Sequence, residues 1–532
     1  MSLVLTLNLK SISQVSLVAF IAANLTACFS VTDSSVEKNY VAQPLAYQQL
    51  LPRQQVSNPW FQQGVMSLQK KMQNPALRHS LSKARNVILF VGDGMGVSTV
   101  SAARILQGQI AGGAGEENLL SFEKFPFSGF SKTYNVNQQT PDSAGTMTAM
   151  MAGIKTDAGV LSVDEHGNRG DCTSAKKRGV TTLLELAKQA GKAAGIVTTA
   201  RITHATPAAA YAKSPERDWE NDGELSPEAK AAGCIDIAQQ LVDFDGGIDL
   251  VLGGGRKHFL PHQQLLKNQQ GTRLDGKNLI KQWQASYPQG QYLDSKQGLL
   301  ALKKTENTPV LGLFNDSHMS YGAQKSDEPS LVEMTDVAVT RLKNDTDGFF
   351  LIVEAGRIDH GHHGGNAYNA LHETINLSDA VASTLAQVDL SETLVVVTAD
   401  HSHVMTFGGY PKRGNPILGK VIASGEDSPK LAGDGLPYTT LSYMNGRGMH
   451  DLGMEGNADA VKKREINVGR KDISALNTQL PGYHQEALIP RHSETHGGED
   501  VGIYATGPGA QWLTGVNEQQ MIFHVMAHSL LN

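Results

Sequence analysis

The chain has 532 residues, of which 40% are apolar and 18% charged, a composition typical of a folded globular protein. Its length suffices for one large domain or for about two to three ordinary ones. The formal net charge is −6, and the lysines and arginines are scattered along the sequence. This distribution excludes a basic surface stripe of the kind that binds nucleic acid, so no nucleic-acid partner is expected.

The N-terminus carries the pattern of a secretion signal. Lys10 is followed by an apolar run at 12–24, too short to span a membrane, and then by the sequence LTAC at 25–28. These four residues resemble the lipobox of bacterial lipoproteins, in which Cys28 is lipidated and becomes the mature N-terminus. An ordinary secretion signal with an incidental cysteine is the alternative. We therefore expect an exported protein with a signal peptide at 1–27, lipid-anchored on the periplasmic face of a bacterial membrane or at the cell surface.

Three further segments define the expected domain organisation. Residues 28–56 are polar and lack periodicity, which predicts a flexible tether. The stretch 59–85 has helical periodicity, with one apolar face formed by Phe61, Val65, Leu68 and Met72. The segment 407–495 is rich in Gly, Pro, Asn and Tyr and shows no long helix. We interpret it as a crown-like insertion into a catalytic domain formed by 57–406 and 496–532.

Short apolar runs alternate with longer stretches of helical periodicity through the rest of the chain. The runs predict strands at 87–91, 195–199, 248–252, 349–353, 394–398 and 502–505, and the helices between them include 181–190, 235–242, 331–343 and 367–388. Continuous apolar strands alternating with helices are typical of an α/β fold, a central mostly parallel sheet sandwiched by helices. In such sheets, ligands gather at the carboxyl ends of the strands.

Two cysteines remain beyond Cys28, namely Cys172 and Cys234. In an exported chain, such a pair favours a disulfide. Closing a loop of about 60 residues would stabilise the fold by roughly 4 kcal/mol in the chain-entropy model. Two free buried thiols are the alternative.

A glycine-rich turn, GDGMG at 92–96, follows the first predicted strand. It does not fit the dinucleotide-binding pattern, because Val97 occupies the position of the third glycine. An acid inside the turn would also repel a pyrophosphate. Asp93 at a strand end suits a cation instead, since the glycines allow a close approach of backbone and metal.

Other strand ends also carry carboxylates, imidazoles and one hydroxyl. Singly, each could be a surface or capping turn, but five strand ends share one plausible place to converge. Asp359 and His363 are four apart, so they share a face if their segment is helical. Imidazole with carboxylate suits Zn²⁺, and carboxylate with hydroxyl suits Mg²⁺. The candidate ligands beside Asp93 are His204, Thr206, Glu354, Asp359, His363, Asp400, His401 and His496.

Ser143 is the candidate nucleophile. It precedes a predicted helix of small residues at 144–151, where free N–H groups favour an anion. Asp142 and Ser143 could also be simple capping residues. The sequence lacks a G-x-S-x-G elbow, so activation by a metal ion is the more plausible chemistry. Arg217 could clamp phosphate oxygens, although alone it would pass for a surface arginine.

Six segments together resemble the alkaline phosphatase family, and most closely its animal-type branch. They are VGDGMG at 91–96, PDSAG at 141–145, THATP at 203–207, DHGHH at 359–363, TADHSH at 398–403 and THGGED at 495–500. The resemblance runs in order from about residue 59 to the C-terminus. His204 and His360 stand where the animal-type pattern has histidine. The spacing of Cys172 and Cys234 also resembles a disulfide of that branch.

The resemblance implies a role for each matching residue. One zinc ion would be held by Asp359, His363 and His496, the second by Asp93, Asp400 and His401, and one magnesium ion by Asp93, Thr206 and Glu354. His204 and His360 would lie near the magnesium and the phosphate without binding a metal directly. His362 and His403 match the motifs but have no ligand role in the family. Ser143 would be the nucleophile and Arg217 the phosphate clamp.

The implied activity is the hydrolysis of phosphate monoesters through a phosphoserine intermediate. The implied assembly is a homodimer, with the helix near 59–72 and the insertion as interface pieces. Animal-type enzymes carry a further calcium site fed by acidic residues, but Asn315 stands where an acid is expected, so calcium is not expected here. The alternatives are a phosphodiesterase or sulfatase on the same metal core, or a non-catalytic metal- or phosphate-binding lipoprotein. Ser143 lacks the C/S-x-P-x-R context that sulfatases need.

Overall fold

The computed structural model describes residues 44–77, 83–265, 270–303, 305–324, 326–448 and 470–531. The predicted signal peptide and Cys28 lie outside this set. Within these ranges, no helix is both long enough and apolar enough to cross a membrane.

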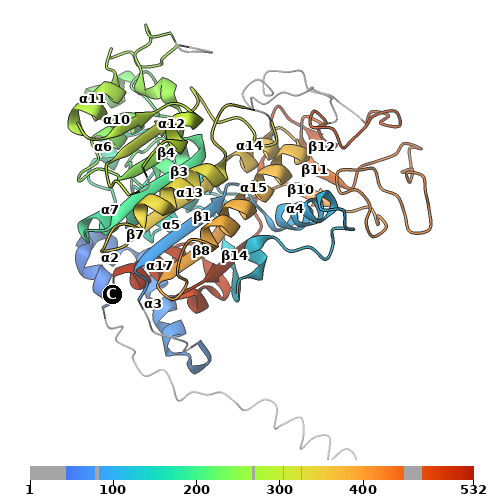
Figure 1. Ribbon diagram of the computed structural model, residues 1–532, viewed down its shortest axis with the longest axis horizontal. Coiled ribbons are helices and arrows are strands. Elements are labelled where there is room, and N and C mark those ends of the chain that lie inside the picture. The colour runs from blue at the N-terminus through green and yellow to red at the C-terminus, as the bar shows by residue number, and fades with distance from the viewer. Residues whose placement is uncertain are drawn as a thin grey trace, which may run out of the picture. The chain divides into compact units, whose positions relative to one another are not determined.

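A ten-stranded sheet forms the centre of the described chain (Figure 1). Only β14 runs antiparallel to its two neighbours, so the predicted mostly parallel α/β sheet is confirmed. In spatial order the strands are β15 (Gly515–Glu518), β2 (Phe127–Lys132), β14 (Val501–Thr506), β8 (Thr393–Ala399), β1 (Asn86–Gly92), β7 (Phe349–Ala355), β3 (Ala193–Arg201), β4 (Leu250–Gly254), β6 (Val310–Leu313) and β5 (Gln291–Leu293).

Helices cover both faces of this sheet, because side chains alternate along each strand. In β1, Val87 and Leu89 pack into one core and Ile88 and Phe90 into the other. The first core includes α3 (Pro59–Gln73), α5 (Ser143–Ala152), α7 (Leu183–Gln189), α10 (Ile237–Val242), α11 (Leu279–Ser286) and α17 (Met521–Leu531). The second includes α4 (Val97–Ile110), α12 (Lys296–Leu300), α13 (Leu331–Leu342) and α15 (Ala367–Leu385), of which α13 and α15 lie side by side in Figure 1.

Shorter elements complete the described fold. They are the 3-10 helices η1 (Ala46–Leu50), η2 (Pro75–Leu77), η3 (Ser121–Lys124), η4 (Arg256–Phe259) and η5 (Ala510–Leu513), the helices α2 (Arg53–Ser57), α6 (Cys172–Ala175), α8 (Ala205–Ala208), α9 (Pro227–Ala231) and α14 (Arg357–His363), and the strand pair β9 (Ser402–His403) and β13 (His496–Gly497).

Two expectations about the N-terminal part were wrong. The tether was expected to extend to residue 56, but η1 and α2 are helical there and Tyr47 is fully buried against the first core. The predicted helix at 59–85 ends at Gln73, because Pro75 disfavours helical geometry at Asn74. The apolar face is as predicted, with Phe61, Val65 and Leu68 buried.

The insertion forms a small sheet of its own. In it, β11 (Leu441–Gly446) and β12 (Ala487–Pro490) join β10 (Met405–Phe407), whose last residue is the first of the insertion. Residues 449–469 lie outside the described part of the chain. The last residue of the predicted insertion is followed by β13, which pairs antiparallel with β9 and so returns the chain to the carboxyl edge of β8.

Cys172 and Cys234 form the predicted disulfide, with Cα atoms 5.8 Å apart. Beside it lies a small separate cluster of buried residues that includes Trp219 and Leu225. Trp219 is two residues from Arg217. The bridge thus supports the loop that carries the predicted phosphate clamp.

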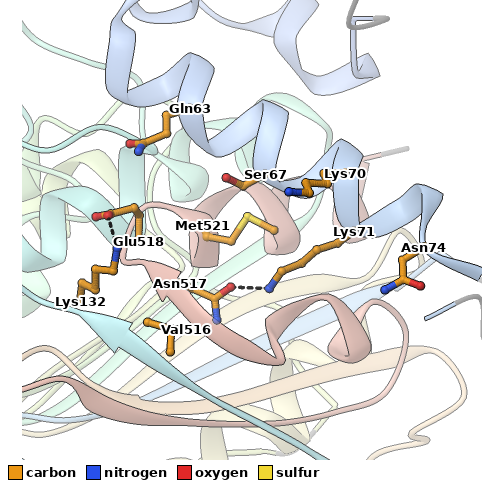
Figure 2. Close-up of a pocket in the computed structure, with 10 residues that line it drawn as sticks. All are labelled: Gln63, Ser67, Lys70, Lys71, Asn74, Lys132, Val516, Asn517, Glu518 and Met521. Carbon is orange, nitrogen blue, oxygen red and sulfur yellow. Dashed lines mark hydrogen bonds and ion pairs between the residues drawn. The ribbon is translucent and has the colours of Figure 1, made fainter. Parts of the chain in front are cut away.

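A cavity of about 580 Å³ lies between α3 and β15, away from the strand ends that the motifs mark (Figure 2). The Nζ of Lys71 donates hydrogen bonds to the carbonyl oxygens of Trp512 and Thr514, at 2.8 and 2.7 Å. These bonds tie α3 to the edge of the sheet. The lining contains none of the predicted site residues; it consists of Gln63, Ser67, Lys70, Lys71, Asn74, Lys132, Val516, Asn517, Glu518 and Met521.

Candidate metal centre

The predicted ligands converge at the carboxyl ends of β1, β7 and β8. Strand register explains this, since Gly92 pairs with Ala355 on one side and Ala399 on the other. The residues that follow β1 and β8, Asp93 and Asp400, are therefore neighbours. Gly94 adopts φ +71°, and a Cβ built there would lie 2.3 Å from the His403 ring, so this position requires glycine.

Asp93, Asp400 and His401 form the first group of potential metal ligands, and all three are fully buried. The Nε2 of His401 lies 3.4 Å from Oδ1 of Asp93 and 3.4 Å from Oδ2 of Asp400. Those two carboxylate oxygens have no hydrogen-bond partner within the described residues. Buried unpartnered carboxylate oxygens around one imidazole fit a divalent cation.

The electrostatics of this group point the same way. Burial, with the charges of Asp400, Asp359 and Glu354, raises the pKa of Asp93 well above its ordinary value. Burial raises the pKa of Glu354 to about 8, with the charge of Asp400 adding to the rise. Carboxyl groups with raised pKa values are ones whose negative charge the protein alone does not neutralise. A bound cation would supply that charge.

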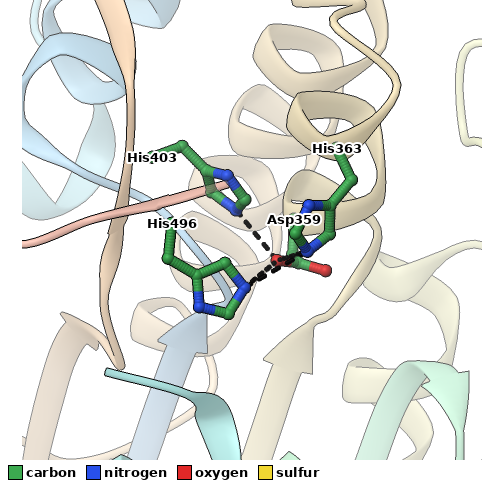
Figure 3. Close-up of side chains that lie close together, drawn as sticks. All are labelled: Asp359, His363, His403 and His496. Atoms are coloured by element: carbon green, nitrogen blue, oxygen red, sulfur yellow. Dashed lines mark hydrogen bonds and ion pairs between the residues drawn. The ribbon is translucent and has the colours of Figure 1, made fainter. Parts of the chain in front are cut away.

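The second group consists of Asp359, His363, His403 and His496. Asp359 and His363 share one face of α14, as predicted from their spacing. Figure 3 shows the three imidazole rings pointing toward one carboxylate oxygen. The Nε2 atoms of His403, His363 and His496 lie 2.8, 3.2 and 3.4 Å from Oδ1 of Asp359.

Main-chain carbonyls fix the tautomers of the predicted histidine ligands. The Nδ1 of His363 lies 2.7 Å from the carbonyl oxygen of Glu494, and that of His496 lies 2.7 Å from the carbonyl oxygen of Pro141. A carbonyl only accepts, so each Nδ1 carries the proton and each Nε2 presents a lone pair. The two Nε2 atoms face each other at 3.2 Å. Two lone pairs at that distance repel unless a cation or a proton lies between them, so the arrangement fits zinc.

The third group consists of Asp93, His204 and Glu354. Oε1 of Glu354 and Nδ1 of His204 have no hydrogen-bond partner in the described chain. Thr206 also reaches this group, since its Oγ1 lies 3.4 Å from Oδ2 of Asp93. His204 is the N-cap residue of α8, and Thr206 lies within that helix. One helical turn still brings both side chains to the group.

Ser143 lies at the first position of α5, and its Oγ is 3.1 Å from Nε2 of His401. Asp142 caps the helix by accepting from the N–H of Gly145 at 3.1 Å, so the capping interpretation holds for Asp142. Asp142 also holds Arg217, whose Nη1 lies 2.9 Å from its Oδ2. Burial lowers the pKa of Arg217, but the charge of Asp142 outweighs this and raises it overall. Arg217 is thus a fixed positive charge beside Ser143.

His360 stands next to a histidine that the sequence did not single out. Its Nδ1 donates to the carbonyl of Gly356 at 2.9 Å, which leaves Nε2 as the acceptor. Its ring centroid lies 5.6 Å from that of His204 and 4.0 Å from that of His318. Arg201 in turn contacts Nε2 of His318 at 2.5 Å. His360 therefore borders the third group without belonging to it.

Comparison with known proteins identifies the family. Residues 84–531 match the family model described as alkaline phosphatase. The chain belongs to the alkaline phosphatase family. It is 45% identical over 481 residues to the tissue-nonspecific isozyme of Gallus gallus, with 88% of each chain covered. It is 42% identical over 488 residues to the alkaline phosphatase of Gadus morhua, which covers 90% of this chain and 97% of that one. The predicted activity, EC 3.1.3.1, is confirmed.

Solved structures of the family share the fold. The alkaline phosphatase of Thermus thermophilus superposes with a TM-score of 0.60 at 24% identity, over 90% of this chain and 95% of that one. The enzyme from the Antarctic bacterium TAB5 superposes with a TM-score of 0.57 at 22% identity, over 85% of this chain and 99% of that one. At these identities the likeness supports the fold alone.

His403 and Glu494 make contacts at the site of this alkaline phosphatase that the sequence did not predict. His403 was expected to have no ligand role, and both of its ring nitrogens are occupied, by Asp359 at 2.8 Å and by Glu494 at 2.5 Å. Burial lowers the pKa of His403, but the charge of Glu494 and the two hydrogen bonds raise it to about 10. Glu494 was not predicted at all. The only signal was its place two residues before His496.

The carboxylates of Glu328 and Asp316, near Asn315, already have partners within the described residues. Glu328 accepts hydrogen bonds from Nδ2 of Asn315 at 2.6 Å and from the N–H of Ser320 at 2.7 Å. Asp316 pairs with Arg256 at 2.6 Å. Arg256 thus neutralises Asp316, and both oxygens of Glu328 are hydrogen-bonded, so Asn315, Asp316 and Glu328 do not fit calcium.

Proposed function

We propose that this enzyme hydrolyses phosphate monoesters through a phosphoserine on Ser143, at a centre of two zinc ions and one magnesium ion. The carrying observation is the position of the Ser143 hydroxyl, 3.1 Å from Nε2 of His401, beside three groups of ligand atoms. A buried serine among imidazoles and unpartnered carboxylates has no evident structural purpose. It has the surroundings of an activated nucleophile.

The ligand groups fit the metals that the resemblance implies. We assign one zinc to Asp359, His363 and His496, the second to Asp93, Asp400 and His401, and magnesium to Asp93, Thr206 and Glu354. The unpartnered oxygens of Asp93, Asp400 and Glu354, and the facing Nε2 atoms of His363 and His496, support this assignment. Bound zinc would supply positive charge that lowers the pKa of the attacking hydroxyl and offsets charge on the leaving oxygen.

The chain's own residues orient the phosphate. Ser143 stands at the N-terminus of α5, where unpaired N–H groups and the helix dipole favour an anion. Arg217 directs Nη1 to Asp142 and Nη2 to His204, at 2.9 and 3.2 Å, so its guanidinium is held in one orientation. In that orientation it can stabilise the phosphoryl oxygens as negative charge shifts during transfer. Ser143 forms the bond to phosphorus, the alcohol departs, and water then hydrolyses the phosphoserine.

Turnover of p-nitrophenyl phosphate by Ser143→Ala tests this proposal. We expect a loss on the order of 10³-fold or more, because the attacking atom is removed while the metals remain. Wild-type turnover by Ser143→Ala would overturn the assignment.

The runner-up, a phosphodiesterase on the same core, predicts faster turnover of bis(p-nitrophenyl) phosphate than of the monoester. Arg217 favours the monoester, because it provides a positive charge for the additional charged oxygen. A non-catalytic role conflicts with the presence of the nucleophile and every ligand.

We also propose that the enzyme is exported and anchored through lipid on Cys28. The Cys172–Cys234 disulfide supports an oxidising compartment. Cys28→Ala should move the protein from the membrane fraction to the soluble fraction. Wild-type protein already found in the soluble fraction with an unmodified N-terminus would contradict the anchor.

A homodimer is part of the proposal. Exposed apolar side chains on α3 and on the insertion support these pieces as its interface, since large exposed apolar residues mark contact surfaces. Light scattering after size exclusion should give twice the chain mass, and a monomeric mass would contradict it. The exposed apolar side chains of this predicted interface are Met66 on α3 and, on the insertion, Phe407, Leu431, Met444, Leu488 and Ile489.

A further inference from the structure

Glu494 is the last buried acid of the insertion, and it contacts His363 and His403 of the second ligand group. It is 1% exposed. Oε2 of its carboxylate accepts from Nδ1 of His403 at 2.5 Å, and Oε1 accepts from the N–H of Val404 at 2.8 Å. Its carbonyl oxygen accepts from Nδ1 of His363 at 2.7 Å, and its N–H donates to the carbonyl of His363 at 3.1 Å. One residue therefore fixes two imidazole rings.

His403 transmits this contact to a predicted zinc ligand. Its Nε2 lies 2.8 Å from Oδ1 of Asp359, while its Nδ1 faces Glu494. Both neighbours are carboxylate oxygens, which only accept, so both ring nitrogens donate. A nitrogen that carries a proton has no lone pair for a metal. His403 thus connects the carboxylates of Glu494 and Asp359.

We propose that Glu494 is a positioning residue for the zinc held by Asp359, His363 and His496. Its side chain orients Asp359 through His403, and its carbonyl oxygen fixes the tautomer of His363 so that Nε2 faces the metal. Hydrogen-bond partners of this kind orient ligands and contribute to metal affinity. The inference rests on the proposed function, because it requires zinc at this group. It also gives the insertion a part in the chemistry, since Glu494 lies where that segment returns to the sheet.

The test measures zinc affinity of the full chain by chelator competition, starting from holoenzyme. Glu494→Gln keeps the side-chain shape and removes its charge. We expect it to lower the affinity for one of the two zinc ions by about 10- to 100-fold. Turnover lost at limiting zinc should return in excess zinc with KM unchanged, which damage to the fold would not allow. Glu494→Asp should retain part of the affinity, because it restores the charge.

Glu486→Gln is the matched control. Glu486 lies in the same segment, and its carboxylate accepts from the N–H of Thr439 at 2.9 Å without touching a histidine ring. The substitution Glu486→Gln should leave the zinc affinity at wild-type values. A double substitution with His403→Gln supplies a second readout, because residues acting in one chain are not additive. Glu494→Gln should add little to the loss that His403→Gln already causes.

The outcomes separate this inference from the proposed function. Wild-type protein that binds no zinc would overturn both. Wild-type protein that binds zinc, with Glu494→Gln within about twofold of it at both sites, would overturn only the role of Glu494. Fully additive effects of Glu494→Gln and His403→Gln would likewise contradict action through His403.

Discussion

The two groups to which we assign zinc are built differently. Asp93, Asp400 and His401 follow neighbouring strands β1 and β8, are fully buried, and combine two carboxylates with one imidazole. Asp359, His363 and His496 combine one carboxylate with two imidazoles, and His363 and His496 are 19% and 15% exposed. The first of these, the carboxylate-rich group, depends on metal charge, because one oxygen of each carboxylate has no hydrogen-bond partner in the described chain. The second, the histidine-rich group, depends on hydrogen bonds that its rings donate to carbonyl oxygens outside it, those of Pro141 and Glu494.

Among substitutions in the two groups, Asp93→Asn should have the largest effect. Asp93 belongs to both the carboxylate-rich group and the third group, so its loss disturbs two metal sites at once. We expect turnover of p-nitrophenyl phosphate to fall on the order of 10³-fold and not to recover in excess zinc. His496→Gln, in the histidine-rich group, should be restored in part by excess zinc. Equal recovery of both variants would remove the distinction between the groups.

Removal of zinc by a chelator should proceed in two phases. Solvent reaches His363 and His496 but not Asp93, Asp400 or His401. We expect the zinc at the exposed group to leave about 10-fold faster, because access governs exchange. Zinc release followed with a coloured chelator measures both rates. A single phase that releases two equivalents would show that burial does not separate the sites.

The metal-free protein should lose stability as pH rises from about 6.5 to 8. Folding raises the pKa of Glu354 from 4.5 to about 8 and that of His403 from 6.5 to about 10. In this window the folded state holds protons that the unfolded state has released, so unfolding becomes easier. Buried histidines with lowered pKa values, such as His204, act below pH 6.5 and so outside the window. Urea midpoints at the two pH values measure the change. A urea midpoint that is higher at pH 8 than at pH 6.5 would contradict the raised pKa of Glu354.

Calcium should have the smallest effect. Glu328 and Asp316 are already paired with Asn315, Ser320 and Arg256. Added calcium should therefore shift the melting temperature of the zinc- and magnesium-loaded enzyme by less than about 1 °C, since a ligand stabilises only in proportion to its binding. A concentration-dependent rise of several degrees would reveal a calcium site.

Sequence patterns predicted that Asp93, Glu354 and Asp400 lie close together, because strand periodicity places them at one edge of a parallel sheet. The spacing of four residues predicted that Asp359 and His363 share one face of α14. They did not predict β2 or β15, whose short runs contain Gly and polar residues and lack a continuous apolar pattern. The contact of Glu494 with His403 joins positions 91 apart and depends on how the insertion returns to β9, which no local pattern encodes.

Metal analysis combined with turnover tests the central claim most directly. Metal-free enzyme should be inactive toward p-nitrophenyl phosphate, and activity should return as two zinc ions and then one magnesium ion bind per chain. The monoester should be turned over faster than bis(p-nitrophenyl) phosphate throughout. Full monoesterase activity in protein shown to contain neither zinc nor magnesium would contradict the account.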